Sequence, residues 1–126
     1  MNATPNLADD LAAWIGPSRT ALLVIDMQVD SASPDGALGG QVDFSSVPSA
    51  LEAAQALVEA ARAAGVAVVF VGLKTSPETD SSAWKERMRR RGGDPDRDIA
   101  VFRAGAAGAD FFGPRPLPGE LVIAKT

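Results

Sequence analysis

The stretch Ala21-Leu22-Leu23-Val24-Ile25-Asp26 decides the fold, because five apolar residues run without interruption into a carboxylate. A run of this length without polar alternation is typical of a strand buried on both faces, as in a parallel sheet. Two further apolar runs occupy residues 66–73 and 121–124. The sequence therefore predicts three strands. The apolar run of the first suits a central place in a complete sheet with later strands, because edge strands are normally short, charged or covered, and within this chain one of its sides is expected to stay unpaired.

One amphipathic helix is predicted between the first two strands. Apolar residues recur at three- and four-residue spacing from Leu51 to Ala61, and Gly65 follows as a left-handed C-cap residue. Ser49 and Glu52 have the spacing of a capping box, which places the helix start at Ser49. Strand, helix and strand in this order form a βαβ unit, so the predicted fold class is α/β. Shorter helices are expected at residues 7–14 and 84–91.

Composition narrows the chemistry of this 126-residue chain, which is 46% hydrophobic and 22% charged. Its net charge of −4 argues against nucleic-acid binding, which depends on neutralising phosphates. No apolar run is long enough to cross a bilayer and no secretory signal opens the chain, so we expect a cytoplasmic protein. The absence of Cys and His excludes a thiolate nucleophile, a serine triad and any His-ligated metal centre within these residues.

Two charged residues, Asp26 and Lys125, stand at the carboxyl ends of the first and third predicted strands. Ligands of open α/β sheets bind beyond this edge, so both side chains could serve one pocket. Strands that are neighbours or next-neighbours lie on the order of 5–10 Å apart. Two plainer interpretations stay open: Asp26 could cap the following turn, and Lys125 could be an exposed lysine at a strand end.

Other polar and aromatic residues carry weaker signals. Asp26 and Asp30 lack the spacing of a phosphotransferase metal pair, and we expect no metal site and no cofactor. The basic run from Lys85 to Arg91 lies near a predicted helix C-terminus, where cations are favourable, and indicates a solvated face. Three aromatic residues are candidates for substrate binding, with packing as the alternative role: Phe44, Trp84 and Phe111.

Several segments, taken in order, resemble the isochorismatase-like cysteine hydrolases, which include N-carbamoylsarcosine amidohydrolases, ureidoacrylate amidohydrolases and nicotinamidases. The matching segments are ALLVIDMQVD at 21–30, PDGAL at 34–38, ARAAGV at 61–66, VFV at 69–71, GADF at 108–111 and PGELVIAK at 118–125. The resemblance implies a hydrolase domain over 20–126, preceded by a lead-in at 1–19. It also implies a three-layer α/β/α fold on a parallel sheet of Rossmann-type topology, of which this chain supplies about the first three strands.

By this resemblance, Asp26 is the acid/base and Lys125 the cation of an Asp–Lys–Cys triad that hydrolyses a C–N bond in a small amide or carbamoyl substrate without a metal. The cysteine attacks a carbonyl carbon, and the aspartate takes its proton and returns it to the leaving amine. In the family that cysteine belongs to a later strand–helix junction, so the chain is expected to end before the nucleophile region. We therefore expect the isolated chain to be inactive and unstable or self-associating.

The sequence departs from the family at two places. Ser31 stands where an aromatic residue usually follows the second aspartate, and residues 74–78 lack the metal-binding histidines of nicotinamidases. The family's strand order puts the third strand beyond the second, so Asp26 and Lys125 need not touch. Pocket residues in the family come partly from neighbouring subunits, which predicts a homo-oligomer. Two alternatives stay open: a vinyl-ether hydrolase that depends on the aspartate rather than a cysteine, and a non-catalytic fragment that acts as a binding or assembly module.

Overall fold

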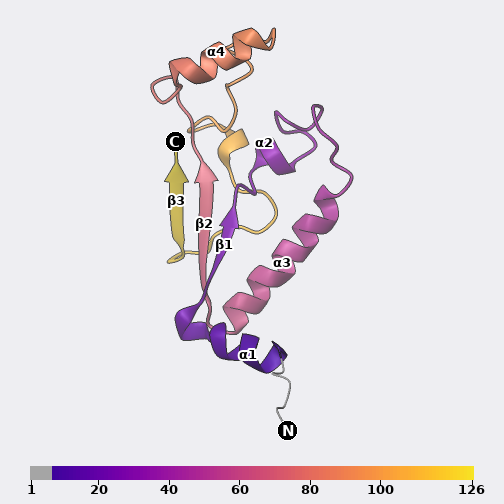
Figure 1. The fold of residues 1–126 in the computed structure, drawn as a ribbon, viewed down its shortest axis with the longest axis vertical. Helices are drawn as coiled ribbons and strands as arrows, with labels where there is room; N and C mark the ends of the chain where they lie inside the picture. Colours follow the sequence, from indigo (N-terminus) through magenta and orange to yellow (C-terminus); the bar gives the residue numbers. More distant parts are fainter. Residues whose placement is uncertain (1–6) are drawn as a thin grey trace.

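Three parallel strands form the centre of the molecule in a computed structural model that describes residues 7–126 (Figure 1). In chain order the elements are α1 (Leu7–Trp14), η1 (Pro17–Arg19), β1 (Ala21–Ile25), α2 (Val29–Ala32), α3 (Val47–Ala63), β2 (Ala67–Leu73), α4 (Ser82–Arg90), η2 (Ala107–Ala109) and β3 (Leu121–Lys125). The three predicted strands and the three predicted helices are therefore confirmed. No helix in the described part of the chain is long and apolar enough to cross a membrane.

The strand order is β1-β2-β3, and both pairings are parallel. The register places Ile25 beside Val71, and Val71 beside Ile123. β2 is thus the central strand. The predicted order, with the third strand beyond the second, is confirmed. Within residues 7–126 β1 pairs with β2 alone, as expected where the later strands of the sheet are not included.

The core lies between the sheet and α3. Val24, Val58, Val68 and Phe70 are each at most 5% exposed and form one cluster. Phe111 packs its ring edge-to-face on Phe70, with centroids 5.2 Å apart. Alternate residues of β2 are buried, as expected when one face of a strand packs against a helix.

The start of α3 differs from the prediction. The helix begins at Val47 with Pro48 in its first turn, and Ser46 is the N-cap residue. Ser49 lies inside the helix, where its hydroxyl donates to the Ser46 carbonyl at 3.0 Å instead of capping. Proline is favoured in a first turn because its missing N–H would have no partner there. The C-terminal prediction is confirmed, since Gly65 has a φ of 71°.

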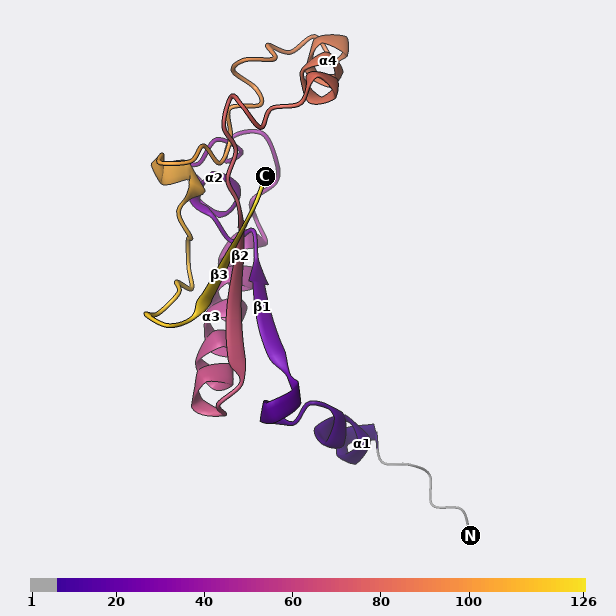
Figure 2. The same ribbon diagram turned by 90° about the vertical axis from the view of Figure 1, so that its left-hand side faces the viewer.

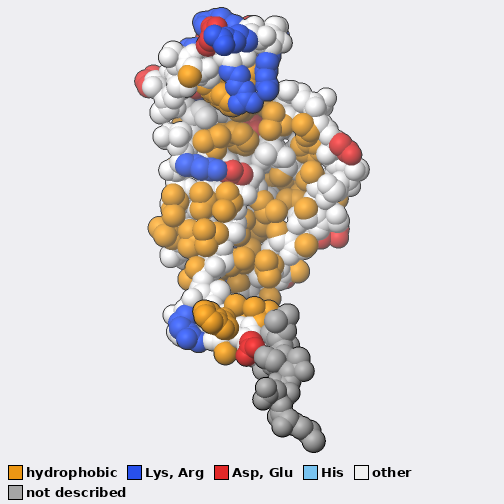
Figure 3. Space-filling model, viewed as in Figure 1, with side chains coloured by type: hydrophobic (Ala, Val, Ile, Leu, Met, Phe, Trp, Pro, Cys, Tyr) orange, Lys and Arg blue, Asp and Glu red, His pale blue; other side chains and the backbone are white. Residues whose placement is uncertain are grey.

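The face of the sheet opposite α3 carries no helix of residues 7–126, and α4 and α1 project past it at its two ends (Figure 2). Paired residues of a sheet point to the same side, so this bare face contains Leu23, Ile25, Leu121 and Ile123, which are 44–58% exposed. Figure 3 shows apolar side chains gathered over the strands on this side. The described residues therefore supply the sheet and one helix layer of the three-layer arrangement.

An ion pair joins the end of α3 to the start of β3. The guanidinium of Arg62 donates from Nε and Nη2 to the two carboxylate oxygens of Glu120, each at 2.8 Å, and Nη2 also donates to the Arg115 carbonyl. The Leu117 N–H donates to the same carboxylate. The Arg62 hydrogen bonds lower the pKa of Glu120 from 4.5 to about 2. This clamp fixes where β3 enters the sheet.

The clamp predicts a pH-dependent contribution to stability. Because the pKa of Glu120 is depressed in the folded state, its contribution is complete above pH 4.5 and is lost as the pH falls toward about 2. Glu120→Gln should lower the free energy of unfolding at neutral pH by about 2 kcal/mol, the value of hydrogen bonds to a charged group. Urea denaturation across this pH range should show the difference from wild type shrinking with acid. Glu52→Gln, on the exposed side of α3, is the control. If the free energy of unfolding of Glu120→Gln stayed below that of wild type by the same amount at every pH, Glu120 would not be the group responsible.

Candidate active site

Asp26 and Lys125 meet at the carboxyl edge of the sheet. Lys125 Nζ donates to Asp26 Oδ2 at 2.6 Å. Two strand spacings amount to about 10 Å, which the two side chains bridge over the end of β2. The prediction that both residues lie at one edge of a parallel sheet is confirmed, and the contact is direct, although the predicted strand order did not require it. In Figure 3 a basic and an acidic group meet at the border of the apolar patch.

The backbone of Asp26 turns away from the sheet in the left-handed region, with a φ of 57°. Its N–H still donates to the Val71 carbonyl at 2.9 Å, so the strand pairing extends to this residue. Its carbonyl accepts the Gln28 N–H at 2.9 Å and the Ser31 hydroxyl at 2.6 Å. Aspartate tolerates this conformation better than most residues. Ser31 departs from the family pattern, and its hydroxyl stabilises the turn at Asp26 through this hydrogen bond.

The ion pair is partly open to solvent, with side chains 45% exposed for Lys125 and 41% for Asp26. Exposed pairs of this kind contribute about 0–1 kcal/mol to stability. The second carboxylate oxygen, Asp26 Oδ1, is buried and has no hydrogen-bond partner among the described residues. A buried acceptor without a donor is costly in a folded protein, and it is available to bind a donor from outside these residues. Stability alone does not account for this arrangement.

Sequence reasoning missed Gln28 as a site residue. Its side chain is fully buried, and its Nε2 donates to the carbonyls of Leu73 at 2.8 Å and Ala109 at 2.7 Å. Its Oε1 accepts the Leu73 N–H at 2.8 Å. The one available signal was its position two residues after Asp26 in the family motif.

Asp30 organises the loops behind the site. Its Oδ1 accepts the Ala37 N–H at 3.1 Å, and its Oδ2 accepts the Phe102 N–H at 2.6 Å. Gly108 packs directly on this carboxylate, because a Cβ there would lie 2.4 Å from its oxygens. In the described part of the chain no three His, Cys, Asp or Glu side chains gather into a group that could hold a metal ion.

The loop after β2, where nicotinamidases carry their metal-binding histidines, is held by an ion pair. Arg103 donates to both oxygens of Asp80, at 2.9 and 2.6 Å, and to the Thr75 hydroxyl at 3.2 Å. The Arg103 hydrogen bonds lower the pKa of Asp80, so the pair stays charged in mild acid. This loop therefore has a fixed course beside the carboxyl edge.

The three aromatic candidates lie in three different places. Phe111 belongs to the core beside Phe70. Phe44 lines an apolar cavity of about 240 Å³ together with Phe112 and residues of α3. Trp84 lies on α4, 43% exposed, with the Arg87 guanidinium 5.0 Å from its ring centroid. The structure does not gather them around Asp26 and Lys125, and their role in substrate binding stays a prediction.

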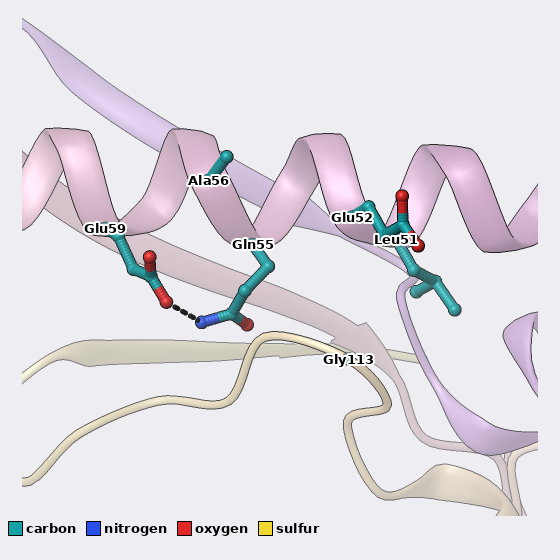
Figure 4. A pocket seen from close by; sticks show the side chains of 6 residues that line it. All are labelled: Leu51, Glu52, Gln55, Ala56, Glu59 and Gly113. Atoms are coloured by element: carbon teal, nitrogen blue, oxygen red, sulfur yellow. Dashed lines mark hydrogen bonds between the residues drawn. The ribbon is translucent and has the colours of Figure 1, made fainter.

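The predicted solvated face of the basic run agrees with the structure, since α4 buries none of its residues. An open hollow of about 430 Å³ lies elsewhere, along the flank of α3 beside Gly113 (Figure 4). Glu52 and Glu59 line it, and Glu59 accepts a hydrogen bond from Gln55 at 2.8 Å. Neither Asp26 nor Lys125 lines this hollow, so the candidate site is defined by the ion pair and not by a cavity.

Comparison with known proteins assigns the chain to a family. The model of the isochorismatase domain matches residues 20–126. The ureidoacrylate amidohydrolase RutB of Azorhizobium caulinodans is 32% identical in an alignment 126 positions long. The alignment covers 88% of this chain and 53% of that protein. The chain belongs to the isochorismatase family, as the sequence motifs predicted.

Solved structures agree on the fold. A cysteine hydrolase from Pseudomonas syringae pv. phaseolicola superposes with a TM-score of 0.66 at 27% identity, covering 86% of this chain and 47% of that one. N-carbamoylsarcosine amidase from Thermoplasma acidophilum has a TM-score of 0.60 at 22% identity, covering 84% and 51%. The parallel α/β fold is confirmed, and the chain spans about half the length of the proteins it matches.

The left-handed backbone of Asp26 predicts an unusual order of stability among variants. Asp26→Ala should be less stable than Asp26→Gly by about 1 kcal/mol, because a Cβ is costly at this φ and glycine has none. Urea unfolding of both variants measures the difference. The same two substitutions at the exposed Asp35 provide the control, where φ is not positive and alanine should be at least as stable as glycine. An alanine variant that equals or exceeds the glycine variant at position 26 would show that the turn is not strained.

Proposed function

We propose that this chain carries the aspartate and lysine of a metal-independent hydrolase site that cleaves the C–N bond of a small amide or carbamoyl compound. Asp26 is the acid/base, and Lys125 is its cationic partner. The nucleophile of such a mechanism is a cysteine, which these 126 residues do not contain. Hydrolysis then requires a cysteine supplied from outside them.

One observation supports this proposal most strongly. The carboxylate of Asp26 has one oxygen on Lys125 Nζ at 2.6 Å and a second, buried oxygen without a partner. This combination suits an acid/base, because Lys125 holds one oxygen in place and the free oxygen can accept a proton from a nucleophile placed beside it. Ureidoacrylate, named in the relative from Azorhizobium caulinodans, is a compound of the proposed substrate class.

A second candidate follows from the absence of cysteine. Vinyl-ether hydrolysis of the isochorismatase kind depends on the aspartate rather than on a cysteine, and the chain has the aspartate. Turnover of a vinyl ether by the purified chain, lost in Asp26→Asn, would favour this activity over amide hydrolysis. Amide turnover by the chain alone would contradict the proposed cysteine mechanism.

A chimera tests the amide proposal directly. Residues 20–126 would replace the matching part of the Azorhizobium caulinodans ureidoacrylate amidohydrolase, whose remaining part stays unchanged. We expect a folded chimera to hydrolyse ureidoacrylate, and Asp26→Asn to reduce the rate by about 10²–10⁴-fold, the usual contribution of a general acid or base. Lys125→Met should also lower the rate, and Asp35→Asn is the matched control that should not. A folded chimera that keeps its activity with Asp26→Asn would rule out the proposed role.

A further inference from the structure

The side chain of Gln28 lies where the next peptide group of β1 would lie. β1 pairs with β2 up to the Asp26 N–H, which donates to Val71, and the left-handed turn then carries the backbone away. The N–H and C=O of Leu73, one step further along β2, would have no partner on that side. Gln28 supplies both, through Oε1 and Nε2, each at 2.8 Å. One amide thus replaces a backbone donor and acceptor of the parallel pairing.

On its other side, the end of β2 determines the position of Lys125. Leu73 is the register partner of Lys125, and the Lys74 N–H donates to the Lys125 carbonyl at 2.9 Å. Gln28 also contacts Asp26, the partner of Lys125 in the ion pair, because the Gln28 backbone N–H donates to the Asp26 carbonyl at 2.9 Å. One residue is therefore bonded to Asp26 through its backbone and to the strand beside Lys125 through its side chain.

A third hydrogen bond fixes the amide in place. Nε2 also donates to the Ala109 carbonyl at 2.7 Å, and the side chain is fully buried. Any other orientation of the amide would leave one of these buried groups without a hydrogen bond, which is costly. The amide therefore has a single favourable orientation. Gly72 leaves room for it, since a Cβ there would lie 3.2 Å from both Cδ and Nε2 of Gln28.

We infer that Gln28 is a positioning residue, whose buried amide holds the end of β2 so that Lys125 reaches Asp26. Its side chain is fully buried and acts through Leu73. Its importance for catalysis rests on the proposed function, but the geometric claim concerns the ion pair itself. An experiment without substrate therefore tests it, and its failure would leave the proposed hydrolysis standing.

The experiment follows the Lys125 ammonium group by NMR in the full chain labelled with ¹⁵N-lysine, at low temperature and mildly acidic pH. Lysine ammonium protons held on a carboxylate exchange slowly enough with water to be observed. Wild type should show the Lys125 signal, and Asp26→Asn should lose it. Gln28→Glu keeps the size of the side chain and an acceptor for the Leu73 N–H, but in either protonation state it cannot donate to the Leu73 and Ala109 carbonyls together, as the amide does. We expect the Lys125 signal to be lost while the amide signals of β1 and β2 persist.

A milder variant keeps the test decisive if Gln28→Glu does not fold. Gly72→Ala leaves the amide intact, and its Cβ would lie 3.2 Å from Gln28 Cδ and Nε2 and from Phe111 Cζ. Both side chains must give way by a few tenths of an ångström, so the Lys125 signal should weaken while the strand amides persist. Gln55→Glu on α3 and Gly40→Ala, where a Cβ meets nothing within 4 Å, are the matched controls and should leave the signal unchanged. An unchanged Lys125 signal in folded Gln28→Glu would overturn the inference. If that variant is unfolded, an unchanged signal in Gly72→Ala overturns it.

Discussion

The end of β2 is the position on which the rest of the site depends. Its last residue, Leu73, is bonded through Gln28 on one side and is paired with Lys125 on the other. Parallel strands bring their carboxyl ends to one edge, so a charged residue after β1 and another at the end of β3 meet across this point. The two charges come from positions separated by 99 residues, and the strand between them sets their separation.

The two ion pairs of β3 differ in geometry. Glu120, before the strand, receives two parallel hydrogen bonds from Arg62 and another from a backbone N–H, so both of its oxygens are used. Asp26, opposite the end of the strand, receives one bond from Lys125 and keeps an oxygen free. Bidentate pairs of arginine and carboxylate give fixed geometry. A lysine is a point charge, which here bonds one carboxylate oxygen and leaves the other without a partner among the described residues.

The sequence allowed prediction of the features that depend on local pattern. Uninterrupted apolar runs located all three strands, and the rule for parallel sheets brought Asp26 and Lys125 to one edge. The predicted start of α3 was wrong, because the spacing of Ser49 and Glu52 suggested a capping box. The helix begins at Val47 instead, with Pro48 in the first turn, where proline is favoured. The role of Gln28 could not be predicted, since its side-chain partners lie 45 and 81 positions away in the chain. The direct contact of Asp26 and Lys125 includes a residue with a left-handed dihedral angle, which no periodicity reveals.

That dihedral angle also shapes how the chemistry of this fold can be lost in evolution. The residues that accept a left-handed backbone at little cost are glycine, asparagine and aspartate. Every aspartate codon becomes an asparagine or a glycine codon by one nucleotide change. The substitutions that least disturb the turn are therefore also among those most easily reached, and each removes the carboxylate. A lineage released from selection for hydrolysis can lose this carboxylate while its sheet stays intact, so an unaltered fold is no record of retained activity.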